Sequence, residues 1–173
     1  MCGITGFITE LNYQKENSIN NLEKMINSID HRGPDSKGKW IFQDTLYFGH
    51  TRLSIQDLTT NGTQPMFSNT GQYCIIFNGE IYNHHELKKE VHYDWKSSSD
   101  TETILALFEK YGVNNSLKKL EGMFALACFD IFNKKLYLAR DFAGEKPLYF
   151  GWSNNVFFFS SELKSMNANS YFQ

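Results

Sequence analysis

Apolar residues recur at helical spacing in two long stretches of the chain. Residues 18–30 carry a single apolar stripe, which predicts a helix that packs by one face. A second helix is predicted to begin at Ser99, because Ser99 and Glu102 form a capping box ahead of an apolar run that ends at Gly112. A shorter helix is predicted over residues 84–91.

Strand-like runs occupy most of the remaining chain. Short turn signals such as Asn133-Lys134 separate several of them, and turns of this length require antiparallel neighbours. Helices lie between and around these runs without regular βαβ alternation, so the sequence predicts the α+β class. Residues 161–173 lose their pattern, and no element is predicted there. The expected strands are 3–8, 38–44, 45–55, 73–77, 123–129, 135–140, 147–152 and 156–160.

The apolar run at residues 73–77 stops at Asn78-Gly79-Glu80. A short apolar run of this kind predicts a buried strand, which would deliver the three polar residues to an edge or rim of a sheet. Asn-Gly is also the commonest hairpin dipeptide, so a plain turn is the alternative.

Length and charge limit the classes of function. A chain of 173 residues fits one domain with a real core, and a net charge of −2 gives no electrostatic argument for nucleic acid or membrane binding. The sequence shows no long apolar run of the kind that makes a signal peptide or a spanning helix, so a cytoplasmic protein is expected.

The cysteines and histidines suggest neither disulfides nor metal. Cys74 and Cys128 lie in apolar runs and are expected in the core. Four of the histidines lack metal-ligand spacing, so no metal site is predicted. These histidines are His50, His84, His85 and His92.

Cys2 directly follows the initiator methionine. Removal of Met1 would leave a thiol and a free α-amine on one residue, and an α-amine has a reference pKa of about 7.7–8.0, suited to accepting a proton near neutral pH. Cys2 would then hold both nucleophile and base. The alternative is that Cys2 is one more apolar residue of the opening strand.

Seven blocks in order resemble the class II glutamine amidotransferase domain of the glutamine-dependent asparagine synthetase family. The likeness covers residues 2 to about 165. It implies an N-terminal-nucleophile hydrolase fold, a four-layer αββα sandwich of two antiparallel sheets between helical layers, and a single glutaminase domain over residues 1–173. The blocks are Cys2-Gly3-Ile4, residues 31–36 (HRGPDS), 52–55 (RLSI), 78–83 (NGEIYN), 99–102 (SDTE), 120–125 (LEGMFA) and 140–149 (RDFAGEKPLY).

The resemblance also implies a reaction, in which Cys2 attacks the side-chain amide of L-glutamine and releases ammonia and glutamate. Asn78, through its side-chain amide, and Gly79, through its backbone N–H, would stabilise the oxyanion. Arg52 would bind the substrate carboxylate and Asp100 its ammonium. The full set of implied substrate-binding residues is Arg52, Leu53, Ser54, Ile55, Gln56, Asn78, Gly79, Glu80 and Asp100.

Three residues of the HRGPDS block, His31, Arg32 and Asp35, are expected to support the pocket rather than take part in the reaction. Full-length members of the resembled family continue into an ATP-pyrophosphatase domain with a Ser-Gly-Gly-x-Asp-Ser loop, which this sequence lacks. No cofactor is therefore expected here, and ATP and magnesium would belong to a synthetase domain in the same protein or a separate chain. Aspartate or another carboxylate would receive the ammonia.

Two other functions remain open from the sequence. The chain could be an N-terminal-nucleophile amidase for a different amide substrate. It could also be a catalytically silent domain that binds amino acids or a partner protein.

Overall fold

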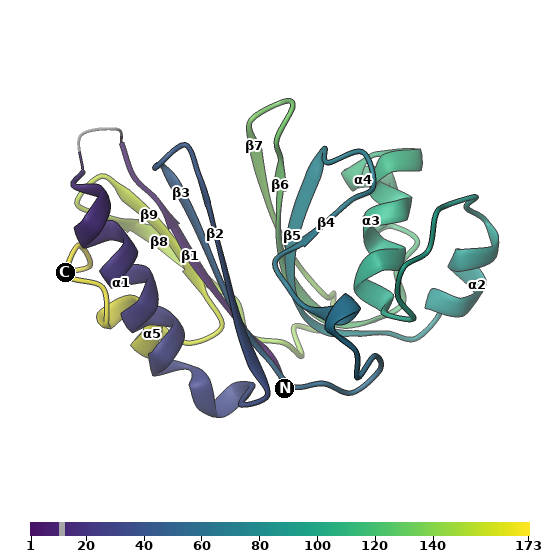
Figure 1. Cartoon of the computed structure of the whole chain (residues 1–173), viewed down its shortest axis with the longest axis horizontal. Helices are drawn as coiled ribbons and strands as arrows, with labels where there is room; N and C mark the ends of the chain where they lie inside the picture. The colour runs from purple at the N-terminus through teal and green to yellow at the C-terminus, as the bar shows by residue number, and fades with distance from the viewer. Residues whose placement is uncertain (11–12) are drawn as a thin grey trace. The chain divides into compact units, whose positions relative to one another are not determined.

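The computed structural model describes residues 1–10 and 13–173, which form two compact units (Figure 1). Unit 1 consists of residues 1–53 and 147–173, and unit 2 of residues 54–146. Among the helices formed by the described residues, none has the length and hydrophobicity needed to cross a bilayer.

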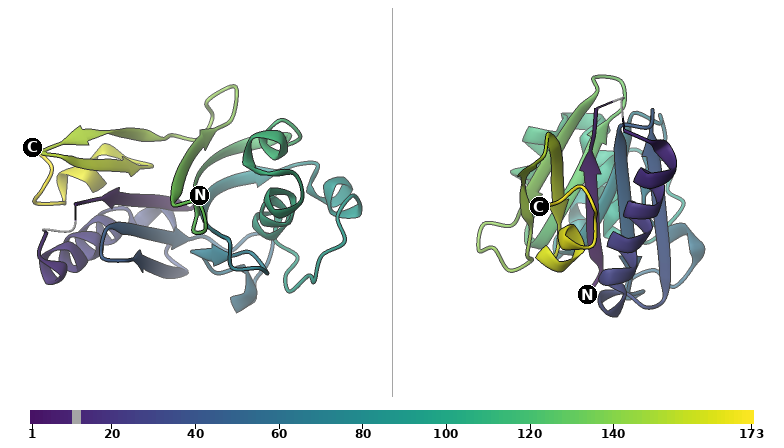
Figure 2. Two further views of the ribbon diagram at one scale, coloured as in Figure 1. Left: turned by 90° about the horizontal axis from the view of Figure 1, so that it is seen from above. Right: turned by 90° about the vertical axis from the view of Figure 1, so that its left-hand side faces the viewer.

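Unit 1 is built on a five-stranded antiparallel sheet with the order β2-β3-β1-β9-β8. Helices α1 and α5 lie on one face of this sheet (Figures 1 and 2). Strand β1 is the central strand of the sheet. Cys2 directly precedes it and therefore lies at one end of this central strand. The strands are β1 (Gly3–Ile8), β2 (Ser36–Phe42), β3 (Leu46–Arg52), β8 (Tyr149–Ser153) and β9 (Val156–Ser160), and the helices are α1 (Lys15–Ser28), the 3-10 helix η1 (Asp30–Arg32) and α5 (Leu163–Asn167).

The core of unit 1 joins α1 to the sheet. The predicted apolar stripe supplies Leu22 and Met25, which are fully buried against side chains of β1 and β3. Phe7 and Tyr47 stack there with ring centroids 4.5 Å apart and an angle of 7° between the rings. The helix starts three residues earlier than the stripe and ends at Ser28.

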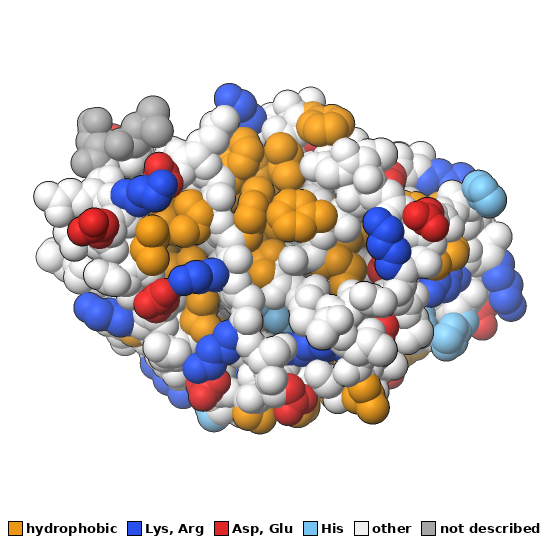
Figure 3. Space-filling view, in the orientation of Figure 1, with side chains coloured by type: hydrophobic (Ala, Val, Ile, Leu, Met, Phe, Trp, Pro, Cys, Tyr) orange, Lys and Arg blue, Asp and Glu red, His pale blue; other side chains and the backbone are white. Residues whose placement is uncertain are grey.

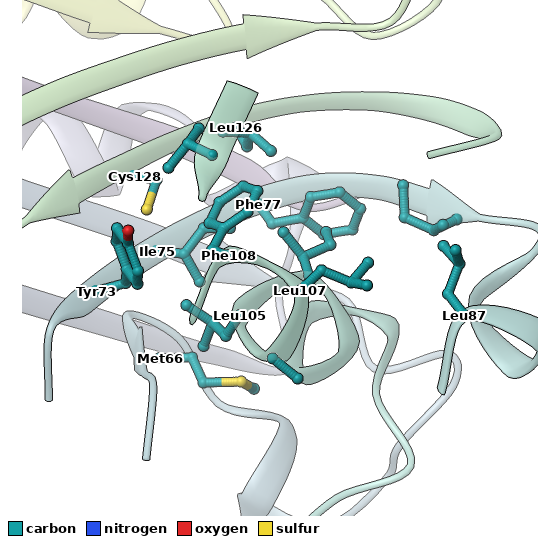
Figure 4. Close-up of a cluster of buried hydrophobic side chains, with 14 of the residues drawn as sticks. Met66, Tyr73, Ile75, Phe77, Leu87, Leu105, Leu107, Phe108, Leu126 and Cys128 are labelled. Carbon is teal, nitrogen blue, oxygen red and sulfur yellow. The ribbon is translucent and has the colours of Figure 1, made fainter. Parts of the chain in front are cut away.

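Unit 2 is built on a four-stranded antiparallel sheet with the order β4-β5-β6-β7. Helix α3 packs on β5, and Tyr73 contacts Phe108 of the helix edge to face at 5.9 Å within the cluster drawn in Figure 4. The elements are η2 (Thr60–Gly62), β4 (Met66–Phe67), β5 (Tyr73–Ile81), α2 (His84–Lys89), α3 (Asp100–Tyr111), α4 (Val113–Leu117), β6 (Gly122–Asp130) and β7 (Lys135–Arg140).

The capping box at the start of α3 forms in part. Ser99 is the N-cap, and its hydroxyl accepts a hydrogen bond from the N–H of Thr101. The Glu102 carboxylate does not reach back to Ser99. It accepts instead from the backbone N–H groups of Lys96 and Ser97, each at 2.8 Å. The helix ends at Tyr111, and its C-cap is Gly112, whose φ of 74° favours glycine.

Strand β5 is longer than the sequence predicted. It runs to Ile81, so Asn78, Gly79 and Glu80 lie inside the strand and not in a turn beyond it. Gly79 pairs with Phe124 of β6, and a Cβ at Gly79 would come within 2.2 Å of the Met123 carbonyl oxygen. The glycine therefore permits a close approach of two strands, which a turn signal read from the sequence does not reveal.

A second difference concerns the chain end, where residues 161–173 were expected to have no element. They contain α5, which long-range hydrogen bonds fix to the rest of unit 1. Ser165 Oγ lies 2.8 Å from Thr5 Oγ1 and donates to the Met25 carbonyl at 3.1 Å. Five residues are too few to show a helical period, because one turn and a half gives no repeat.

The hairpin expected at residues 38–44 and 45–55 is formed by β2 and β3, whose ends differ by one to three residues, and its turn contains Gln43 and Asp44, both at positive φ. The predicted α+β class with antiparallel sheets is confirmed. On the face seen in Figure 3, lysine and arginine side chains alternate with acidic ones. The described residues form several ion pairs, such as Lys39 with Glu23 at 2.6 Å.

Candidate functional site

The Cys2 side chain in unit 1 is fixed by the backbone of Leu53. The N–H of Leu53 donates to Cys2 Sγ at 3.4 Å, and the thiol donates to the Leu53 carbonyl at 3.6 Å. These contacts follow from the pairing of β1 with β3, in which Gly3 faces Thr51. The carbonyl oxygen of Cys2 accepts a hydrogen bond from Arg32 Nε at 3.0 Å. Both the sulfur and the carbonyl of Cys2 are therefore held by other parts of unit 1.

Arg52, the expected carboxylate-binding residue, is the last residue of β3 and is 8% exposed. The HRGPDS block packs against this strand end. The N–H of Asp35 donates to the Arg52 carbonyl at 3.0 Å, and a Cβ at Gly33 would lie 2.5 Å from the Arg52 nitrogen. The block thus packs against the backbone that carries Arg52, and its role in supporting the pocket stays a prediction.

Asn78 in unit 2 has a buried amide without a partner. Its side chain is 1% exposed, and its Nδ2 makes no hydrogen bond with any described residue. Buried amide groups in folded proteins are nearly always paired. A buried donor without a partner loses its hydrogen bond to water, which lowers the free energy of unfolding by about 1–3 kcal/mol. An unpaired N–H donor in a buried position can bind an oxygen atom that a substrate brings.

The N–H of Gly79 points away from β6. The neighbouring N–H groups of Phe77 and Ile81 leave the β5–β6 pair and bond to the side chains of Gln64 at 2.6 Å and Asp100 at 3.0 Å. Backbone N–H direction alternates along a strand, so the Gly79 N–H faces the same edge of β5 as these two. It is therefore not used in the β5–β6 ladder.

Asp100 is a buried carboxylate of unit 2. It is 5% exposed, and no lysine, arginine or histidine among the described residues forms an ion pair with it. Burial raises the pKa of Asp100 to about 6, and the nearby charge of Glu80 adds to the rise, while backbone N–H groups of Ile81 and Thr101 oppose it. An ammonium group beside Asp100 would stabilise the charged carboxylate and lower its pKa again.

Gln56 links two of the predicted substrate-binding residues. Its Oε1 accepts from the backbone N–H of Asp100 at 3.3 Å, and its Nε2 donates to Glu80 Oε1 at 3.5 Å. Unit 2 thus brings Gln56, Glu80 and Asp100 together. Ser54 and Ile55 begin the same loop, and the Ile55 side chain is 69% exposed.

Cys74 and Cys128 lie in the core, as the sequence predicts. Cys74 and Cys128 are free thiols with no exposed surface, and burial raises the pKa of both. His50 and His84 are buried. Within residues 1–10 and 13–173, no cluster of three or more histidine, cysteine or acidic side chains could hold a metal ion.

One residue near Cys2 has no signal in the sequence. Glu162 accepts a hydrogen bond from Arg32 Nη1 at 2.9 Å, the same guanidinium that binds the Cys2 carbonyl. The pair is separated by 130 positions. No local spacing or motif connects two residues so far apart, so only the tertiary structure reveals the contact.

Comparisons with known proteins relate the sequence of the chain to one family. The sequence pattern of a family described as a glutamine amidotransferase domain matches residues 1–173. A putative glutamine-hydrolyzing asparagine synthetase of Methanocaldococcus jannaschii is 38% identical and covers 97% of this chain and 35% of its own length. A glutamine-hydrolyzing asparagine synthetase of Bacillus subtilis is 41% identical and covers 96% of this chain and 26% of its own. The chain thus spans about a third or less of these curated relatives.

A solved structure confirms the predicted fold. Glutamine phosphoribosylpyrophosphate amidotransferase of Bacillus subtilis, in complex with ADP and GMP, matches with a TM-score of 0.77 at 22% identity. The match covers 96% of this chain and 43% of that chain.

Proposed function

Because the chain belongs to the glutamine amidotransferase domain family, we propose that it hydrolyses the side-chain amide of L-glutamine to glutamate and ammonia. The observation that carries the proposal is the buried Asn78 amide nitrogen, which no described residue accepts from. A donor left unpaired in the resting protein is available for charge that develops during a reaction, and oxyanion stabilisation requires such a donor.

Cys2 is the proposed nucleophile. Removal of Met1 frees the α-nitrogen, which takes the thiol proton while Sγ bonds to the amide carbon of glutamine. The carbonyl oxygen becomes an oxyanion stabilised by Asn78 Nδ2 and the Gly79 N–H. The α-ammonium then returns the proton to the departing nitrogen, ammonia leaves, and a thioester remains. Water attacks the thioester carbon, releasing glutamate and restoring the thiol.

Two charged residues are proposed to select the amino-acid end of the substrate. The Asp100 carboxylate is buried and forms no ion pair with a described residue, so it fits the α-ammonium. The planar guanidinium of Arg52 fits the α-carboxylate with two parallel hydrogen bonds. Leu53, Ser54 and the backbone at Ile55 would line the substrate, and the remaining predicted contacts are Gln56 and Glu80.

The role of the ammonia is also a proposal. The printed names of the two relatives describe glutamine-hydrolyzing asparagine synthetases, and this chain covers only 35% and 26% of their lengths. We propose that residues 1–173 form one glutaminase domain that supplies ammonia to an ATP-dependent amidation in the cytoplasm. The amidating domain would lie in the same protein or a separate chain. It would use the ATP and magnesium, so the glutaminase domain itself would need no cofactor.

The test is glutamate release from glutamine by the chain after removal of Met1. Glutamate and ammonia are expected in equal amounts, and the Cys2→Ala variant is expected to lose about 10³-fold or more of the rate, because no other group replaces the nucleophile. Cys128→Ala is the matched control, because Cys128 is fully buried. Full activity of the Cys2→Ala variant would refute the proposal.

The two other functions predict different results. An amidase for another substrate would leave the KM for glutamine unaltered in Arg52→Ala. A silent domain would release no glutamate, and intact-mass spectrometry of protein isolated from cells would show Met1 retained.

A further inference from the structure

A buried arginine connects Cys2 to the far end of the chain. Arg32 donates from Nε to the Cys2 carbonyl at 3.0 Å and from Nη1 to Glu162 Oε1 at 2.9 Å. The Arg32 side chain is only 8% exposed, while that of Glu162 is 25% exposed. One rigid planar group therefore holds two partners that lie 160 residues apart in sequence.

Residue 3, next to Cys2, has no room for a side chain. A Cβ at Gly3 would lie 2.6 Å from Thr51 Oγ1 and 2.9 Å from Ile29 Cδ1, so a larger residue would displace these side chains. Arg32 itself is the last residue of η1, where its N–H bonds to the Ile29 carbonyl at 3.0 Å. The glycine after Cys2 thus has a packing reason.

Glu162 is placed by the exit of β9. Ser161, directly before it, bonds to Ile4 twice, through its N–H to the Ile4 carbonyl at 2.8 Å and through its hydroxyl from the Ile4 N–H at 3.0 Å. These bonds tie the end of β9 to the start of β1. The Glu162 carboxylate is therefore held near the residue that follows Met1.

Glu162 carries a negative charge at neutral pH. Burial raises the pKa of Glu162, but hydrogen bonds from Arg32, His31 and Lys164 outweigh burial and lower it overall. His31 Nε2 lies 3.0 Å and Lys164 Nζ 3.2 Å from the carboxylate. Both of these partners are about half exposed, whereas Arg32 is buried, so Arg32 is the partner that most needs the carboxylate.

We propose that Arg32 is a positioning residue for Cys2 and that Glu162 orients Arg32 for this task. The inference rests on the proposed function. The Cys2 carbonyl is fixed by Arg32 and its sulfur by Leu53, so the bond geometry at the Cys2 Cα fixes where its nitrogen points. Nucleophile and base are then held together, and a displacement of about 1 Å at a reacting group can cost about 10²-fold in rate.

Three variants test the proposal. Glu162→Ala removes the partner of Arg32 and is expected to lower kcat about 10-fold with the KM for glutamine within about 2-fold of the parent. Glu162→Gln keeps an oxygen that accepts from Arg32 and is expected to restore most of kcat. Arg32→Lys keeps the charge but cannot hold both partners, so a loss of about 10²-fold in kcat is expected.

The matched control is Glu23→Ala, which removes the partner of Lys39 in an exposed ion pair of the same unit. It is expected to leave kcat unchanged. Rates are normalised to the fraction of Cys2 that a glutamine-like diazoketone can alkylate, so partial unfolding does not imitate the effect. A second readout is the carbonyl ¹³C chemical shift of Cys2, which is expected to move in Arg32→Lys and not in Glu23→Ala.

Two results would overturn the positioning role. One is a parent kcat in both Glu162→Ala and Arg32→Lys, and the other is a Cys2 carbonyl shift that ignores Arg32→Lys. A parent protein without glutaminase activity whose Cys2 carbonyl still responds to Arg32→Lys gives a different answer. That result would remove the proposed function while the contact itself stands.

Discussion

The surroundings of Cys2 in unit 1 and the end of β5 in unit 2 differ in how their polar groups are satisfied. The sulfur and carbonyl of Cys2 both have protein partners at hydrogen-bond distance. These two atoms are thus paired in the resting protein, although Arg32 Nη2 has no partner among the described residues. In unit 2, the Asn78 amide nitrogen has no partner among the described residues. The Asp100 carboxylate accepts from the Ile81 N–H but has no described cation beside it.

This difference separates two tasks in the proposed reaction. A nucleophile must keep one geometry, and the hydrogen bonds to the sulfur and carbonyl of Cys2 fix that geometry. A binding region must gain free energy from the ligand, so unsatisfied groups serve that region, at the expense of folding stability. Substitutions in unit 2 should therefore separate activity from stability.

Asn78→Ala is expected to have the largest effect on this comparison. Loss of one oxyanion donor typically lowers kcat by about 10²–10³-fold. The free energy of unfolding should stay the same or rise, because the variant removes a buried polar atom that has no partner. Steady-state kinetics and urea unfolding measure both. A clear fall in stability with kcat unchanged would mean that Asn78 is structural.

The pH dependence of stability should show the cost of Asp100. The pKa of this carboxyl is about 6 in the folded protein against 3.8 as its reference value. Between these values the folded state keeps a proton that the unfolded state has lost, so stability falls as pH rises. Over this interval, the lost free energy of unfolding is about 3 kcal/mol.

Other carboxyls act in the opposite direction, so the comparison must be made with a variant. The pKa values of Asp130 and Asp141 are lowered, because hydrogen bonds to each carboxylate outweigh burial, and this stability is lost as pH falls. The difference between the parent and Asp100→Asn isolates the Asp100 contribution. The exposed Asp94→Asn is the control. Identical unfolding curves for parent and Asp100→Asn from pH 4 to 7 would contradict the account.

Asp100→Asn should also weaken substrate binding. An asparagine can still accept from the Ile81 N–H but no longer offers a charge to an ammonium. A hydrogen bond to a charged group contributes about 1.5–3 kcal/mol, so the KM for glutamine should rise about 30-fold with a smaller change in kcat. An unchanged KM would show that Asp100 does not bind the substrate amine.

Ser99→Ala should have the smallest effect. The variant removes the N-cap of α3 and should lower the free energy of unfolding by about 1 kcal/mol. The KM should stay within about 2-fold of the parent, because the Asp100 carboxylate is held by Ile81 and not by Ser99. Ser99→Gly is the control, with an expected loss of a few tenths of a kcal/mol. A KM that rises with the loss of the cap would join the two roles.

Local patterns along the chain predicted the helices α1 and α3. The stripe in α1 and the cap of α3 were readable, because each depends on residues within a few positions of one another. The end of β5 was predicted wrongly, because Gly79 is required by the close approach of the Met123 backbone in another strand. Helix α5 was missed for a similar reason, since its contacts are with Thr5 and Met25.

The site shows the same division. Cys2, Asn78 and Asp100 were predicted from motifs, and their assigned roles remain proposals. What the sequence does not contain is which of their atoms have partners. The lack of an acceptor for Asn78 Nδ2 among the described residues and the pairing of Arg32 with Glu162 depend on distances between remote residues.

The most direct measurement is the mass of the Met1-free protein after treatment with diazo-oxo-norleucine, a diazoketone that mimics glutamine. One adduct on Cys2 is expected, and none in Cys2→Ala. Cys74 and Cys128 should stay unlabelled, because burial raises the pKa of both thiols and leaves neither exposed. A folded, Met1-free protein that forms no adduct, or forms one at Cys74 or Cys128 instead, would contradict the claim that Cys2 is the nucleophile.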